Sequence, residues 1–234
     1  MLFRSGTGMW AALSILAALR ERDRSGVGAA LEASLMDTSL AWVSYHMMGY
    51  MATGRVPGPM GSSLGAIAPY RAFRTSDGYV MIAAGNDAIF RRLCAALELP
   101  ELAEDPRFAS NPERVAHRAD LDPLVEGATE RLTTEELLRR TKEHSIPASA
   151  IQSIDQVVDD PQVLAAGMFP PVAHPTVAGY RDVSLPLRMD GARPRAERVP
   201  PSRGEHSLEI LEELGFEPDE IEALLETGAV TQGD

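Results

Sequence analysis

The spacing of apolar positions predicts that the chain begins with two long helices. From Thr7 the run TGMWAALSILAALRER is apolar at helical spacing, and it ends in a basic turn followed by Gly26. A second helical pattern covers residues 29–54, AALEASLMDTSLAWVSYHMMGYMATG. The opening MLFRSG carries neither a helix cap nor a strand pattern. We therefore expect the first helix to begin at Thr7 and the second to end at Gly54.

The pattern changes after these helices. Residues 53–67, TGRVPGPMGSSLGAI, are rich in glycine, proline and serine, which predicts a loop. YRAFRT and YVMIAA then flank SDG, which favours a hairpin. Helices follow, with Asn86 or Asp87 as one N-cap and Thr133 or Thr134 as another. A small α+β module is thus predicted to begin at residue 68.

The last third of the chain is broken by proline and glycine. The run PPVAHPTVAGYRDVSLPLRMDGARPRAERVPP has short alternating pieces, which suit irregular strands lying over another domain. The last pattern, SRGEHSLEILEELGFEPDEIEALLETGAV, predicts two short helices separated at Gly215 and Pro218.

Composition narrows the class of protein. At 234 residues, 44% hydrophobic and 24% charged, the chain is of the globular type. Its net charge of -12 argues against nucleic acid or an anionic membrane as partner. The single Cys94 excludes a disulfide framework and suits a cytoplasmic location, and the five histidines show no metal-binding spacing. The apolar run Met9–Leu19 is too short to cross a bilayer, so we expect no membrane as partner. Because the histidines and the single cysteine show no metal-binding spacing, we also expect no metal.

Four blocks carry a family resemblance, in chain order. They are TGMWAALSILAALRERDRSGVG, then APYRAFRTSDGYVMIAAGNDAIFRRLCAALELPELAEDPRFASNPERV, then IPASAIQSIDQVVDDPQVLAAGMF, and finally PPSRGEHSLEILEELGF. This succession resembles the class III CoA-transferase family (CaiB/BaiF-like), which includes formyl-CoA and carnitine CoA-transferases and alpha-methylacyl-CoA racemases. The resemblance covers nearly the whole chain, but only the C-terminal half of the family.

The resemblance implies a fold and an assembly. Family members combine a Rossmann-like α/β large domain with a small α+β domain and a C-terminal segment that returns to the large domain. Residues 1–52 would be the terminal helices of the large domain, 53–67 a glycine-containing loop, 68–166 the small α+β domain and 167–234 the return. Two such chains interlock as rings, so a homodimer is expected, or else a partner that supplies the missing N-terminal half.

The resemblance also implies a chemistry. In the transferases a D-x-x-T-G pattern precedes the first helix, and its aspartate attacks an acyl-CoA thioester. Thr7 and Gly8 match the end of that pattern, but Arg4 stands where the aspartate belongs. A guanidinium has no nucleophilic oxygen, so we expect no activity from this chain alone. The resemblance implies a CoA thioester and a carboxylate acceptor as substrates and no cofactor; the opening MLFRSG is alternatively a misplaced start or a cut.

Two further site assignments follow from the resemblance, each with an alternative. Gly58, Gly61 and Gly65 match the glycine-rich loop that covers the active site of transferases; they could equally form a plain linker. Asp87 matches a racemase glutamate that exchanges a proton, whereas its ordinary role would be a helix N-cap. CoA transfer is therefore the main prediction, and the alternatives are a racemase or a non-catalytic interaction module. In either case the first two helices should expose apolar side chains where the large-domain sheet would pack.

Overall fold

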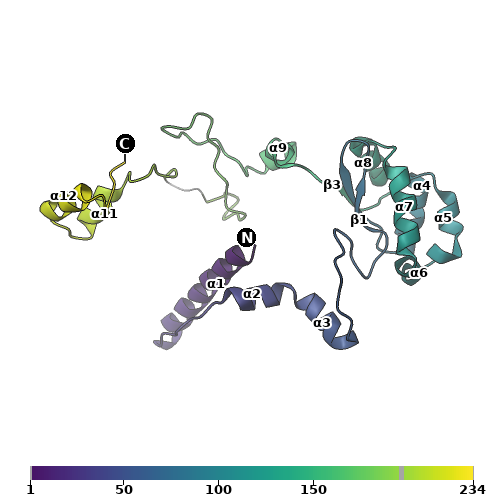
Figure 1. The fold of residues 1–234 in the computed structure, drawn as a ribbon, viewed down its shortest axis with the longest axis horizontal. Helices are drawn as coiled ribbons and strands as arrows, with labels where there is room; N and C mark the ends of the chain where they lie inside the picture. Colours follow the sequence, from purple (N-terminus) through teal and green to yellow (C-terminus); the bar gives the residue numbers. More distant parts are fainter. Residues whose placement is uncertain (1, 195–197, 234) are drawn as a thin grey trace.

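The computed structural model describes residues 2–194 and 198–233. Figure 1 shows three groups of elements along the chain: N-terminal helices, a packed α+β unit, and an extended C-terminal segment that carries short helices.

The N-terminal group consists of α1 (Leu2–Ser25), α2 (Leu35–Trp42) and α3 (Ser44–Thr53). The predicted start at Thr7 is wrong, because residues 2–6 are already helical. Gly6 is buried in the contact with α2, where an added Cβ would overlap the Trp42 ring. A glycine that reads as a helix breaker in the sequence therefore permits the close packing of two helices.

The second predicted helix begins later than expected and is interrupted once. Residues 26–34 are not helical, and α2 begins only after Ser34, whose side chain accepts the Asp37 N–H at 3.0 Å. Val43 then separates α2 from α3, and Gly54 ends α3 in the left-handed conformation, as predicted. The apolar spacing correctly predicted helical structure in this region, but it did not show that Ser34 caps a helix inside the run.

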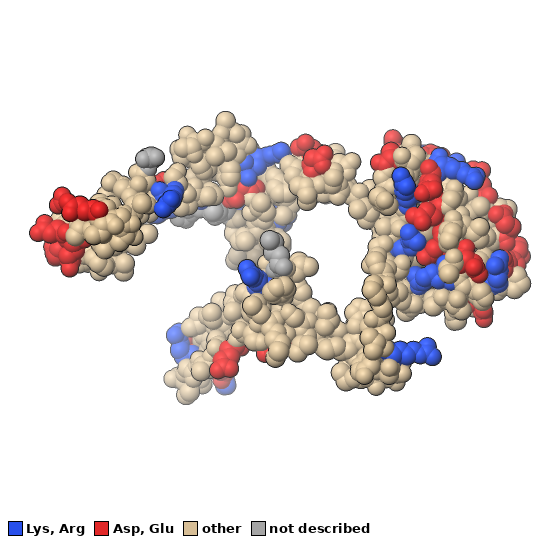
Figure 2. Space-filling view, in the orientation of Figure 1, with Lys and Arg blue, Asp and Glu red and all other residues tan. Residues whose placement is uncertain are grey.

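The N-terminal helices expose large apolar side chains, as expected from their sequence. Leu13 is 55% exposed and Leu16 64%, and Trp42 and Tyr45 are also exposed on α2 and α3. Figure 2 shows this part of the molecule almost free of charged residues in its middle. The 24-residue α1 is longer than the apolar run Met9–Leu19, and by length and composition alone it could cross a membrane, although packed helices of soluble proteins meet the same criteria.

The sheet is antiparallel, with the order β1–β2–β3. It consists of β1 (Tyr70–Arg74), β2 (Tyr79–Ala83) and β3 (Ala148–Ala150). Tyr70 lies opposite Ala83, and Arg74 lies opposite Tyr79, so the hairpin predicted around SDG is confirmed. The third strand was not predicted.

Helices cover this sheet and complete the α+β unit. The caps are Asn86 and Thr133, one of each predicted pair. Contacts join α7 to β1 and α8 to β2 and β3, while α4 packs against α5 and α8. The helical elements are α4 (Asp87–Ala96), α5 (Pro100–Glu104), the 3-10 turn η1 (Pro106–Phe108), α6 (Asn111–Ala116), α7 (Arg118–Thr129) and α8 (Thr134–Glu143).

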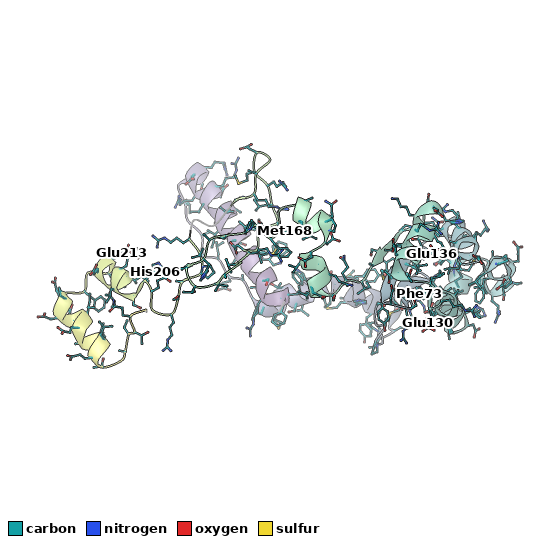
Figure 3. All side chains as sticks on the ribbon, turned by 90° about the horizontal axis from the view of Figure 1, so that it is seen from above. Phe73, Glu130, Glu136, Met168, His206 and Glu213 are labelled. Carbon is teal, nitrogen blue, oxygen red and sulfur yellow. The ribbon has the colours of Figure 1, made fainter. Side chains whose placement is uncertain are left out.

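The hydrophobic core lies between this sheet and its helices. Val80 and Ile82 alternate with more exposed residues along β2, as a half-buried strand requires. Phe73 is fully buried, and Figure 3 places it among the densely packed side chains of this unit. The fully buried residues also include Phe108, Leu121 and Leu137 from the helices.

The C-terminal segment has little core of its own. Its helices are α9 (Ile154–Val158), α10 (Pro161–Ala165), α11 (Ser207–Glu213) and α12 (Pro218–Glu226). The predicted pair of C-terminal helices is thus confirmed, while the irregular strands are reduced in the described residues to bridges such as Pro171 with Arg181 and Met189 with Ala192. The boundaries proposed at 52, 67 and 166 remain predictions.

Candidate active-site loop and its supports

Residues 54–69 join α3 to β1 and contain the predicted active-site glycines. Residues 54–61, which we call the free half of the loop, are exposed. The free half begins and ends at glycines of positive φ, Gly54 at 68° and Gly61 at 58°. A Cβ on Gly58 or Gly61 would meet no atom within 4 Å, so packing does not require glycine at either position.

Residues 62–69, the anchored half of the loop, are tied to the α+β unit. Ser62 Oγ accepts the Ala72 N–H at 3.0 Å, and the Leu64 N–H donates to the Tyr70 carbonyl at 3.2 Å. Gly65 belongs to this half, and a Cβ there would lie 3.3 Å from the Met60 side chain. The three predicted glycines therefore have different surroundings: Gly58 and Gly61 lie in the free half, and Gly65 lies in the anchored half.

Three side chains from α6 and the start of α7 hold the backbone of the anchored half. The Asn111 Nδ2 donates to the Ala66 carbonyl at 2.9 Å, and its Oδ1 accepts the Ala68 N–H at 3.2 Å. The Arg118 Nη2 donates to the carbonyls of Leu64 and Ile67 at 2.7 and 2.6 Å. The third side chain is that of Arg114, and we call Asn111, Arg114 and Arg118 the loop anchor.

Arg114 is the buried member of the loop anchor. Its Nε donates to the Ala68 carbonyl at 2.8 Å, its Nη1 to the Phe108 carbonyl at 3.0 Å and its Nη2 to Asp87 Oδ1 at 2.8 Å. The guanidinium also lies 4.5 Å from the centroid of the Phe90 ring. Sequence reasoning missed this residue, because nothing in NPERVAH distinguishes a buried arginine from a surface one.

Asp87 is the ion-pair partner of Arg114. The expectation that Asp87 is an N-cap is corrected: Asn86 caps α4 by accepting the Ile89 N–H at 2.9 Å, and Asp87 is the first helical residue. The hydrogen bond from Arg114 holds the pKa of the Asp87 carboxyl below its usual range. A carboxylate with a lowered pKa is poorly suited to exchange a proton near neutral pH, so the geometry favours a structural role.

A cluster of charged side chains lies beside the loop anchor. Arg71 Nη1 is 3.5 Å from Asp122 Oδ2, and its Nη2 is 3.3 Å from Glu126 Oε1. Arg118 Nη1 and Asp122 Oδ1 are both buried and have no hydrogen-bond partner among the described residues. These side chains line a shallow hollow of about 540 Å³. Burial raises the pKa of the Asp122 carboxyl, and the attraction to Arg71 and Arg118 opposes this rise only in part.

Asp122→Asn should therefore stabilise the protein in a pH-dependent way. Because the folded pKa is raised, the native state binds the proton more tightly, and the wild type loses stability as pH rises through that pKa. The variant should melt higher than the wild type at pH 7, and the difference should vanish below a pH of about 4. Melting followed by circular dichroism measures this, with the exposed Asp120→Asn as control. A lower melting temperature for Asp122→Asn at pH 7 would contradict the assignment.

The residues after Arg4 take part in helix packing, whereas Arg4 does not. Arg4 is an exposed residue in the first turns of α1, and this position of the pattern therefore carries a guanidinium instead of a carboxylate. Thr7 Oγ1 donates to the Phe3 carbonyl at 2.8 Å and lies 2.9 Å from Thr38 Oγ1 on α2. The threonine that matches the T-G end of the family pattern therefore joins α1 to α2, while Gly8 is exposed.

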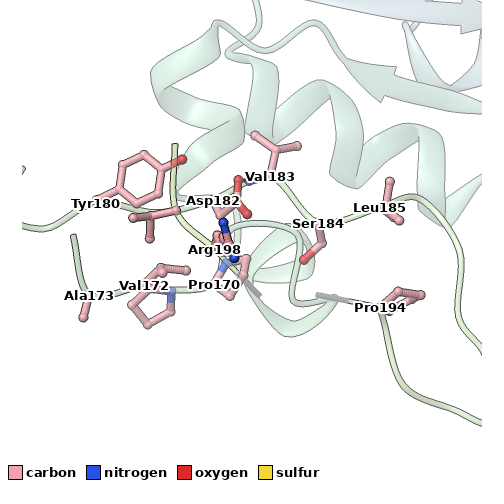
Figure 4. A pocket seen from close by; sticks show the side chains of 12 residues that line it. Pro170, Val172, Ala173, Tyr180, Asp182, Val183, Ser184, Leu185, Pro194 and Arg198 are labelled. Carbon is pink, nitrogen blue, oxygen red and sulfur yellow. Dashed lines mark hydrogen bonds between the residues drawn. The ribbon is translucent and has the colours of Figure 1, made fainter. Parts of the chain in front are cut away.

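The C-terminal segment contains a second hollow, shown in Figure 4. Its volume is about 570 Å³, and it lies between residues 170–185 and the chain around Pro194 and Arg198. Its lining is mostly proline and aliphatic, with Tyr180, Asp182, Ser184 and Arg198 as polar members. This hollow contains none of the predicted site residues.

The remaining chemistry of the described residues is limited. Across residues 2–194 and 198–233, His, Cys, Asp and Glu form no group of three or more that could hold a metal ion. Burial raises the pKa of the Cys94 thiol to about 12, so this side chain is a poor nucleophile.

Figure 2 shows acidic residues gathered over α11 and α12, and mixed charges over the α+β unit.

Known proteins resemble this chain along most of its length. The succinate–glutarate CoA-transferase of Agrobacterium fabrum is 34% identical over 208 residues, covering 89% of this chain and 52% of the relative. The human succinyl-CoA:glutarate CoA-transferase is 30% identical, covering 97% of this chain and 52% of the relative. The chain thus spans about half the length of the curated relatives it matches.

Solved structures agree. A CAIB/BAIF family protein from Brucella suis matches with a TM-score of 0.74 and 35% identity, over 89% of this chain and 54% of that one. The family described as CoA-transferase family III matches residues 2–207 of this chain, a stretch that contains α1, the loop and its anchor. This chain belongs to CoA-transferase family III.

Proposed function

We propose that this chain forms the loop-bearing part of an acyl-CoA:carboxylate CoA-transferase. The observation that carries the proposal is the match of residues 2–207 to CoA-transferase family III, together with relatives that are named as CoA-transferases. The free half of the loop, with Gly58 and Gly61, would cover the reacting groups, since glycine lets backbone N–H groups approach an oxyanion closely.

The nucleophile would come from residues outside this chain, because Arg4 stands at the aspartate position of the pattern. As the resemblance implies, an aspartate carboxylate attacks the thioester carbonyl and CoA leaves as the thiolate, giving a mixed anhydride. The thiolate then attacks the aspartyl carbonyl, which releases the first acid and leaves an aspartyl-CoA thioester. The acceptor carboxylate repeats the two steps in reverse order and leaves as its own CoA thioester.

We propose succinyl-CoA as donor and a dicarboxylate such as glutarate as acceptor. Three relatives support this choice by their names: the two glutarate enzymes above and the succinyl-CoA–D-citramalate CoA-transferase of Chloroflexus aurantiacus, which is 32% identical. The aspartate would be carried by a second polypeptide or, if MLFRSG is a misplaced start, by a longer form with another sequence at that place, in an interlocked dimer in the cytoplasm.

A mixing experiment tests the proposal. The 234-residue chain is assayed for CoA transfer from succinyl-CoA to glutarate, first alone and then with a polypeptide that carries the N-terminal half of a family member. Transfer should appear only in the mixture, and it should be lost when the aspartate of the D-x-x-T-G pattern in that polypeptide is replaced by alanine. Transfer by this chain alone, or absence of transfer from a folded mixture, would contradict the proposal.

A racemase receives less support from the site. Proton exchange at the α-carbon of a substrate needs an acid and a base with pKa values near the working pH. Asp87, the candidate for one of them, is bonded to Arg114 at 2.8 Å, and its pKa is lowered. A non-catalytic interaction module would be the conclusion if the folded mixture showed neither activity.

A further inference from the structure

The side chains of the loop anchor form hydrogen bonds to backbone groups of a single segment. Asn111, Arg114 and Arg118 together make five hydrogen bonds to residues 64–68, and each of these bonds engages a main-chain atom. An exposed loop normally leaves its carbonyls to water. Here protein donors replace water over one short stretch of the loop, so side chains fix its position together with the backbone bond from Leu64 to Tyr70.

The free half of the loop has none of these supports. In the part of the chain that the structure describes, no side chain of α6 or α7 is bonded to residues 54–61. Its ends, Gly54 and Gly61, lie at φ of 68° and 58°, where glycine changes conformation at low cost. The structure thus contains an anchored base, residues 62–69, and a strip of eight residues, bounded by two glycines, that ends at that base.

We propose that Asn111, Arg114 and Arg118 are positioning residues that fix the base of the active-site loop, so that only residues 54–61 move when the loop covers the substrate. This inference rests on the proposed function, because it takes the loop to be an active-site cover. Arg118 is the most informative member, since it is only partly buried and its Nη2 bridges the carbonyls of Leu64 and Ile67.

Hydrogen exchange on the 234-residue chain tests the anchor without any activity. In Arg118→Met the hydrogen-bonded amides within residues 62–69, those of Ser63, Leu64, Ile67 and Ala68, should exchange roughly tenfold faster, while those of β2 and α4 keep the wild-type rate. Arg118→Lys should restore most of the protection, because an ammonium group also donates to two carbonyls. Asn111→Ala should have the same local effect through Ala66 and Ala68. Arg140→Met is the matched control, since Arg140 is also partly buried and bonds the Ala96 carbonyl far from the loop.

Two outcomes would overturn the inference. One is an unchanged exchange rate of residues 62–69 in both Arg118→Met and Asn111→Ala. The other is an equal rise in β2 and α4, which would mean a general loss of stability rather than a released loop.

The catalytic consequence is tested separately in the mixture that shows transfer. A loosened base should admit water, so Arg118→Met should raise the ratio of thioester hydrolysis to CoA transfer several-fold, and Arg118→Lys should lower it again. An unchanged ratio would contradict the positioning role. If the wild-type mixture shows no transfer, the proposed function fails, and the exchange experiment still decides whether the loop base is anchored as described.

Discussion

Replacing Arg114 with methionine should destabilise the α+β unit by about 3 kcal/mol. The change leaves the buried carbonyls of Ala68 and Phe108 without donors, and an unsatisfied buried acceptor costs about 1–3 kcal/mol. It also removes the cation that lies 4.5 Å from the Phe90 ring centroid. Asp87 is 46% exposed, so water can solvate its carboxylate after the ion pair is lost. Urea unfolding followed by circular dichroism should show a midpoint lower by roughly 1–2 M.

Arg140→Met is the control for this experiment as well. Arg140 pairs with Glu136 on its own helix and with the exposed Glu98, so its loss should hardly move the midpoint. Equal midpoints for the wild type and Arg114→Met would show that the buried guanidinium is not needed for the fold. That result would also remove the reason for assigning Asp87 a structural role.

The second large effect concerns the apolar surface of α1. Leu13 and Leu16 lie on one side of this helix and are 55% and 64% exposed. Apolar residues occur all around α1, which is typical of a helix that is buried in its final assembly. If the large domain packs there, each leucine contributes about 1.5–3 kcal/mol, and a buried glutamate adds a desolvation cost. The double change Leu13→Glu and Leu16→Glu should therefore weaken transfer in the mixture by about a thousandfold at limiting concentration.

The matched control is Leu124→Glu, which places the same charge on an exposed leucine of α7, 44% exposed. This variant should keep transfer within about threefold, since surface substitutions away from special features have small effects. Full transfer by the α1 double variant would mean that the N-terminal helices are not the surface on which the large domain packs.

The sequence was most informative where local chemistry decides the structure. The SDG turn between two alternating runs specified the hairpin, and its Asp77 also accepts the Thr134 N–H at 2.7 Å. Polar residues before apolar periods narrowed each cap to two neighbouring residues, and the structure selects Asn86 and Thr133. The strand β3 was missed because ASA has neither length nor β-branched residues, and only its pairing with β2 makes it a strand.

The site was less predictable, because its supports are long-range. The glycines of the loop could be located from the sequence, but the division at Ser62 depends on partners about 40 to 55 residues later in the chain. Arg114 and Arg118 look like surface arginines in NPERVAHRAD, and only the fold brings them to the loop backbone. Gly6 shows the same limit, since Trp42 is the residue that requires it.

The location of the nucleophile is the central claim, and intact-mass measurement tests it most directly. The mixture of this chain with the N-terminal polypeptide is quenched within the first turnovers with succinyl-CoA, and each polypeptide is weighed. The account predicts an acyl or CoA adduct on the N-terminal polypeptide and an unchanged mass for the 234-residue chain. A covalent adduct on this chain would contradict it, because one of its own carboxylates would then be the nucleophile.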